Sequence, residues 1–123
     1  MPTTVHPEYR QVLKTYLSSF DCDVEELDFT KTGVIDTEEI TRRICEETAC
    51  CVLQSPNYFG NIEDFAALRA GLDSNSSLLI VVSNPISLAV LNPPAASGAD
   101  IVCGEGQCLG NPPNYGGPLL GFI

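Results

Sequence analysis

The sequence predicts an α/β fold with three layers, in which helices cover a mostly parallel sheet. Three short apolar runs, at residues 49–53, 78–82 and 101–103, lack alternating polar residues. Such runs are typical of parallel strands that are buried on both faces. Helical patterns separate them, and alternation of strands and helices favours a parallel sheet. The length of 123 residues fits a single domain over 1–123.

The N-terminal part predicts a helix and a short strand. Apolar side chains recur at spacings of three and four, which predicts a helix over 7–20 with one apolar stripe. Pro7 suits the first turn of that helix, because its fixed φ is already helical. A short strand is expected over 24–29, before a turn at Thr32-Gly33.

A second helix, over 36–47, has a clear start signal. Asp36 is a suitable N-cap, and Glu39 three residues later completes the pattern of a capping box. Ile35 and Ile40 flank the box as a hydrophobic staple. The chain should therefore enter this helix at a fixed angle.

Two more helices are expected between the strands. The helix over 62–72 would place Phe65, Leu68 and Leu72 on one face. A shorter helical stretch is expected over 86–91, before a loop that contains two prolines.

Charge and hydropathy exclude some classes of function. The net charge is −10, which disfavours binding to a phosphate backbone, so no nucleic-acid partner is expected. No run reaches the roughly 18 consecutive apolar residues of a transmembrane helix. The first ten residues lack the apolar segment of a signal peptide, so no membrane partner and a cytoplasmic location are expected.

The six cysteines do not form a metal-binding pattern. They are Cys22, Cys45, Cys50, Cys51, Cys103 and Cys108. No C-x-x-C pair is present and the chain has one histidine, so no metal site is expected and the thiols should be ordinary buried groups. Cys50 and Cys51 should point to opposite faces of their strand. Cys108, in a glycine-rich loop, is the candidate for reactivity.

Polar residues follow each of the three predicted strands, at 54–57, 83–85 and 104–107. The carboxyl ends of parallel strands share one edge of a sheet, where ligands of open α/β sheets bind. The candidate site residues are Gln54, Asn57, Glu105 and Gln107. They form either a non-covalent, cofactor-facing rim or simply the polar loops that any sheet carries. Gly104 and Gly106 would let the backbone approach a neighbour closely.

Known catalytic and nucleotide-binding motifs are missing. The glycine loop reads G-x-G-x-x-x-G and runs into Pro112-Pro113, so no helix N-terminus follows it to receive a phosphate. His6 has no evident nucleophile partner, which disfavours a Ser/His or Cys/His hydrolase. His6 is either part of a helix entry or a polar group near a site.

Three long segments resemble the glycine decarboxylase P-proteins of the glycine cleavage system. They are HPEYRQVLKTYL at 6–17, VLQSPNYFGNIEDF at 52–65 and NPPAASGADIVCGEGQCLGNPPNYGGPLLGF at 92–122. The similarity keeps its order over nearly the whole chain and is strongest to subunit 1 of the two-subunit form.

The resemblance implies a fragment of the large domain of the aspartate-aminotransferase-like (type I) pyridoxal-phosphate fold. In the catalytic subunit of the family, the matching loop carries the lysine that binds the cofactor. Gln107 or Cys108 takes that position here, depending on a one-residue gap, so covalent binding of pyridoxal phosphate is not expected. Ser83 and Asn84 stand near the place of the carboxylate that pairs with the cofactor's ring nitrogen.

The function that the resemblance implies belongs to a larger complex. With a lysine-bearing subunit 2, it would decarboxylate glycine and pass the aminomethyl group to a lipoyl carrier (H) protein, with pyridoxal phosphate as cofactor. The isolated chain should be inactive. It should also self-associate, because the sheet lacks neighbours and the apolar run at 119–123 would be exposed. The alternative is a non-catalytic interaction module on the same α/β scaffold.

Overall fold

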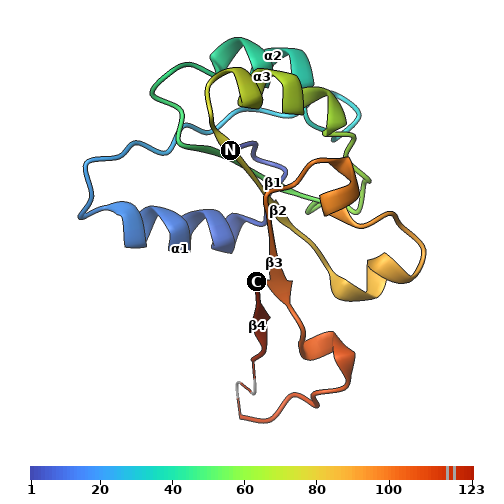
Figure 1. Cartoon of the computed structure of the whole chain (residues 1–123). Coiled ribbons are helices and arrows are strands. Elements are labelled where there is room, and N and C mark those ends of the chain that lie inside the picture. The colour runs from blue at the N-terminus through green and yellow to red at the C-terminus, as the bar shows by residue number, and fades with distance from the viewer. Residues whose placement is uncertain (116, 118) are drawn as a thin grey trace.

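The computed structural model describes residues 1–115, 117 and 119–123 (Figure 1). Along the chain the elements are α1 (Pro7–Leu17), α2 (Thr37–Arg43), β1 (Cys50–Gln54), a 3-10 helix (Ala66–Leu68), α3 (Arg69–Ser74), β2 (Leu78–Val82), two 3-10 helices (Pro85–Ala89 and Pro94–Ser97), β3 (Ile101–Glu105), a 3-10 helix (Gln107–Leu109) and β4 (Gly121–Phe122). Among the described residues, no helix is both long enough and apolar enough to cross a membrane.

The strands form one sheet in the order β1-β2-β3-β4. The first three are parallel, with Cys51 opposite Leu79 and Val81 opposite Val102. The α/β class and the mostly parallel sheet are therefore confirmed. The sequence did not predict β4, which runs antiparallel to β3 and pairs Phe122 with Gly104. Figure 1 shows β4 beside β3 at the edge of the sheet.

The core lies on one face of the sheet. Its buried side chains come from β1, β2, α2, α3 and the segments before them: Ile35, Ile40, Cys51, Leu53, Phe65, Leu68, Leu72, Leu79 and Val81. In Figure 1, α2 and α3 lie together on this side. Burial alternates along β1 and β2, and Leu78 on the second face is 43% exposed. The second face is half-buried at Val52, Ile80 and Val82, so it is covered only in part among the described residues.

The first helix is shorter and more peripheral than expected. It ends at Leu17 instead of residue 20, and none of its side chains is buried. Its apolar stripe does not reach the core, and Tyr16 is 74% exposed. Ion pairs from Arg10 and Lys14 to Glu26 connect it to the following segment.

The strand expected over 24–29 is not formed. Only Leu27 is paired, in an isolated parallel bridge with Pro2. The Leu27 carbonyl accepts from the Thr3 N–H at 2.8 Å, and the Leu27 N–H donates to the Met1 carbonyl at 3.1 Å. The segment 24–29 therefore makes one local bridge and does not join the sheet.

The start of α2 is as predicted, but its end is not. Asp36 caps it, since its Oδ1 accepts from the Glu39 N–H at 3.0 Å. The carboxylate of Glu39 pairs with Arg42 and Arg43 instead of completing a capping box. The helix ends at Arg43, because Ile44 turns its side chain toward the core and takes an extended backbone.

The helix expected over 62–72 begins later, with the 3-10 turn at Ala66. The reason is Glu63, which turns inward. Its N–H donates to Ser55 Oγ at 3.2 Å and its Oε2 accepts from the Ile35 N–H at 2.9 Å. These bonds hold residues 61–65 in a non-helical path.

Candidate functional site

The loops after β1, β2 and β3 meet at one edge of the sheet, as the sequence predicted. Two backbone bonds extend the ladder past the strand ends. The Ser55 N–H donates to the Val82 carbonyl at 3.0 Å, and the Ser83 N–H donates to the Cys103 carbonyl at 2.8 Å. The first residues of neighbouring loops are therefore fixed side by side.

Asn57 is buried and holds its own loop together. Its Oδ1 accepts from the N–H groups of Phe59 and Asn61 at 2.9 and 3.0 Å. Its Nδ2 donates to the Gly33 carbonyl at 2.8 Å and to Glu63 Oε1 at 2.6 Å. Because both ends of the amide are engaged, Asn57 positions backbone rather than offering a free polar group.

Gln54 is linked to the start of α1. Its Oε1 accepts from the His6 N–H at 2.8 Å. The imidazole Nδ1 of His6 accepts from the Glu8 N–H at 3.2 Å, so His6 caps α1. The same ring lies 4.8 Å from that of Tyr9 and 5.1 Å from that of Tyr58. His6 is thus both a helix entry and a neighbour of the predicted rim.

Glu105 and Gln107 close the loop after β3. Glu105 Oε1 accepts from the Gln107 N–H and the Leu120 N–H, each at 2.8 Å. One carboxylate oxygen therefore joins the 3-10 turn to the segment that returns as β4. Gln107 and Cys108 line a surface hollow of about 560 Å³. Whether the four predicted residues face a cofactor stays a prediction.

Gly104 and Gly106 do allow a close approach, but the neighbours belong to the protein itself. A Cβ on Gly104 would collide with the Ser83 carbonyl oxygen and lie 2.8 Å from Phe122 Cζ. A Cβ on Gly106 would lie 3.1 Å from Leu120 Cδ2. The glycines therefore let β3 pack against β2 and β4.

Ser55 and Ser83 belong to the polar stretches predicted at this edge, but their burial was not predicted. Ser83 is 3% exposed, and its Oγ has no hydrogen-bond partner among the described residues. Ser55 is also buried, and its Oγ accepts from Glu63. Both serines line a cavity of about 240 Å³. The available signal was a serine directly after β1 and another directly after β2.

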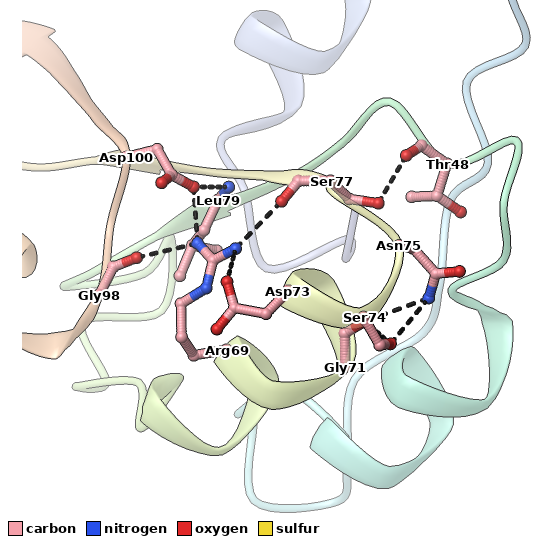
Figure 2. A network of polar contacts seen from close by, with 10 residues as sticks. All are labelled: Thr48, Arg69, Gly71, Asp73, Ser74, Asn75, Ser77, Leu79, Gly98 and Asp100. Carbon is pink, nitrogen blue, oxygen red and sulfur yellow. Dashed lines mark hydrogen bonds and ion pairs between the residues drawn. The ribbon is translucent and has the colours of Figure 1, made fainter.

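A charged network lies at the opposite, amino edge of the sheet (Figure 2). The Arg69 guanidinium pairs with Asp100 Oδ2 at 2.6 Å and with Asp73 Oδ1 at 2.7 Å. It also donates to the Ser77 carbonyl at 3.1 Å. The pKa of the Asp100 carboxyl is held below its usual value, mainly by the hydrogen bond from the Leu79 N–H and secondly by the one from Arg69. The network joins α3 to the starts of β2 and β3, which is a structural role.

Most thiols are not buried, contrary to expectation. Cys50 is exposed and Cys51 is buried, as adjacent strand residues should be. Burial raises the pKa of the Cys51 thiol. Cys108 is exposed, with its Sγ 3.6 Å from Asn84 Oδ1. The other exposed thiols, Cys22 and Cys45, lie outside the described helices and strands. No group of three or more metal-ligating side chains occurs among the described residues.

Solved structures define the class of protein. The chain superposes on the *Thermus thermophilus* aspartate aminotransferase tetra mutant with a TM-score of 0.65 at 17% identity, over 85% of this chain and 30% of that one. It also superposes on a glycine decarboxylase (P-protein) of the glycine cleavage system, in inhibitor-bound form, with a TM-score of 0.86 at 38% identity. That match covers 95% of this chain and 26% of the other. The fold is the aspartate-aminotransferase-like (type I) pyridoxal-phosphate fold.

Sequence comparisons define the family. The model of the glycine cleavage system P-protein matches residues 1–123, and the chain belongs to this family. It is 46% identical over 123 residues to the probable glycine dehydrogenase (decarboxylating) subunit 1 of *Syntrophomonas wolfei*, covering all of this chain and 28% of that protein. It is 50% identical over 120 residues to the *Thermotoga petrophila* protein of the same name, covering 98% of this chain and 26% of that protein. The chain thus spans about a quarter of these relatives.

The residues of this chain do not fit a covalently held pyridoxal phosphate. Covalent attachment needs a primary amine, and the only lysines are Lys14 and Lys31. Lys14 lies on α1, where its Nζ pairs with Glu26 at 2.7 Å. At the end of β2, Asn84 Oδ1 accepts from the Ile86 N–H at 2.9 Å, and it provides no carboxylate.

Proposed function

We propose that this chain is part of subunit 1 of a two-subunit glycine dehydrogenase (aminomethyl-transferring, decarboxylating). Residues 1–123 would form part of its large domain. Family membership and the names of the relatives support this proposal. Together with subunit 2, the whole protein decarboxylates glycine in the cytoplasm. The aminomethyl group then passes to a lipoyl carrier (H) protein.

The observation that carries the proposal is the chemistry at the end of β3. Gln107 and Cys108 occupy the loop in which the family's catalytic subunit has its lysine, and neither has a primary amine. The cofactor, which supplies the carbanion-stabilising chemistry, is therefore held by the partner subunit. This chain contributes a shaped surface.

The role of the rim follows from its contacts. Asn57 and Glu105 use their polar atoms to fix the loops after β1 and β3. Gln54 connects the same edge to His6. Gln107 lines the surface hollow. The edge is thereby held rigid, so it would position a neighbouring subunit or a substrate without moving protons itself.

Reconstitution tests this function. The full-length gene product is combined with subunit 2, pyridoxal phosphate and the lipoyl carrier, and the release of labelled CO₂ from carboxyl-labelled glycine is measured. Release is expected only when both subunits are present. Gln107→Ala should slow it, whereas the matched Gln11→Ala, on the exposed face of α1, should not. Full release by subunit 2 without this protein would support the interaction-module alternative.

A further inference from the structure

Helix α1 carries an apolar stripe that the described residues leave largely uncovered. Tyr9, Val12 and Tyr16 follow one another at spacings of three and four, so they share one face of the helix. None of them is buried, since Val12 is 52% exposed and Tyr16 is 74% exposed. In Figure 1, α1 lies away from α2 and α3. Neighbouring apolar side chains that stay exposed in this way mark interaction surfaces.

Polar contacts fix the orientation of this helix without the stripe. Arg10 and Lys14 pair with Glu26 at 2.6 and 2.7 Å. The Arg10 Nε also donates to the carbonyl of Val5 at 3.0 Å, and Val5 is buried. The helix is thus held with its stripe outward, where another chain has access to it.

The stripe begins beside the predicted rim. The Tyr9 ring lies 4.8 Å from that of His6, and the His6 N–H donates to Gln54 Oε1 at 2.8 Å. The half-exposed ring of Tyr58 lies 5.1 Å from the same imidazole. Under the proposed function, the rim faces subunit 2, which holds the cofactor. A subunit seated on the rim would therefore also reach Tyr9 and the stripe that starts there.

The charge around the stripe indicates the chemistry of the partner. Exposed carboxylates border it, because Glu8 lies in the first turn of α1, and Asp21 and Asp23 lie just past its end. None of these three forms an ion pair among the described residues. Five of the six lysines and arginines of the chain already pair with its own carboxylates, and the net charge is −10. A second copy would therefore add repulsion, whereas a basic surface would complement the border.

We propose that the stripe of Tyr9, Val12 and Tyr16 is a docking surface for subunit 2, which would meet it with apolar side chains bordered by lysines or arginines. Protein interfaces commonly have an apolar centre and a polar edge of this kind. The inference rests on the proposed function and adds a surface on α1 to the interface at the sheet edge. Three side chains cover less than the roughly 800 Å² that each partner buries in a stable complex, so the stripe supplies one part of the interface.

Hydroxyl-radical footprinting identifies what covers the stripe. The full-length gene product is oxidised alone and in complex with subunit 2, and peptide mass spectrometry follows Tyr9 and Tyr16. Both side chains should be oxidised in the protein alone and should lose most of this oxidation in the complex. Protection in the protein alone would mean that another part of the same chain covers the stripe. Unchanged oxidation in the complex would mean that subunit 2 docks elsewhere. Either result overturns the proposal.

A pair of charge variants tests the contact. Tyr16→Asp should raise the dissociation constant for subunit 2 at least about tenfold, as expected for an aromatic residue inside an interface. Gln11→Asp is the matched control, because it places the same charge on another exposed side of α1. It should leave the dissociation constant unchanged. No weakening by Tyr16→Asp, or equal weakening by both variants, overturns the proposal. If Tyr16→Asp does not fold, the footprint of the unaltered protein still decides it.

Two further readouts separate the parts of the inference. Higher salt should weaken binding of the unaltered protein to subunit 2, and binding that is insensitive to salt contradicts the basic border. The release of labelled CO₂ separates the docking surface from the proposed function. If release needs both subunits but the stripe stays exposed in the complex, the docking surface alone is wrong. If subunit 2 releases CO₂ fully without this protein, the proposed function fails and the docking surface fails with it.

Discussion

Replacing Gly104 with alanine should open the seam between β2, β3 and β4. The added Cβ would collide with the Ser83 carbonyl oxygen and approach Phe122 Cζ to 2.8 Å. The Phe122 ring can turn away, but the carbonyl is backbone and cannot. Relief requires β2 and β3 to separate, which breaks the bond from the Ser83 N–H to the Cys103 carbonyl. Overpacking together with one lost bond predicts a loss of about 2–4 kcal/mol in the free energy of unfolding.

Urea unfolding measures this loss. With a slope of about 2 kcal/mol/M, the middle of the range for small proteins, the urea midpoint for Gly104→Ala should fall by about 1–2 M at unchanged slope. Gly121→Ala is the matched control, because Gly121 lies in β4 opposite Glu105 and a Cβ there would meet nothing within 4 Å. The reasoning is refuted if Gly104→Ala unfolds at the original midpoint, or if Gly121→Ala loses as much.

Three further outcomes are expected. The hydrogen bonds that lower the pKa of Asp100 stabilise the fold fully above the ordinary carboxyl pKa of about 4, and this contribution is lost as the pH falls through the lower folded-state pKa. Asp100→Asn should therefore flatten the acid dependence of the urea midpoint, and an unchanged dependence would contradict this. Cys108 should be alkylated before Cys51, because Cys108 is exposed and burial raises the pKa of the Cys51 thiol. Peptide mass spectrometry follows the order of modification, and the reverse order would count against the structure. The isolated chain should self-associate, as measured by sedimentation velocity. The Ile123→Asp variant should associate less, because Ile123 is 94% exposed. A chain that stays monomeric at all concentrations would rule this out.

The parallel sheet was predictable because its signal is local. Each strand is a short apolar run between polar loops, and the helical patterns between the strands made them parallel, which placed three strand ends at one edge. The cap at Asp36 was predictable for the same reason, since an N-cap depends on residues three apart. The helical segment between β1 and β2 was predictable from the spacing of Leu68 and Leu72, which both lie in the core.

Long-range contacts were not predictable from the pattern. The expected helix over 62–72 starts late because Glu63 bonds to Ile35, which is 28 residues away. β4 exists because Phe122 returns to Gly104, which no local periodicity indicates. The second face of the sheet is less buried than expected, since an apolar strand has the same sequence pattern whether a second layer covers it fully or in part. The burial of Ser83 was not predictable either, because a serine after a strand lies in an exposed or a buried loop depending on its surroundings.

The role of subunit 1 is tested most directly by locating the cofactor. The reconstituted complex of both full-length subunits with pyridoxal phosphate is reduced with borohydride, which fixes a lysine-bound cofactor permanently. Peptide mass spectrometry then maps both chains. We expect a modified lysine in subunit 2 and unmodified peptides over residues 1–123 of this chain, including the loop with Gln107 and Cys108. A pyridoxyl adduct on Lys14 or Lys31, or anywhere in this loop, would contradict it.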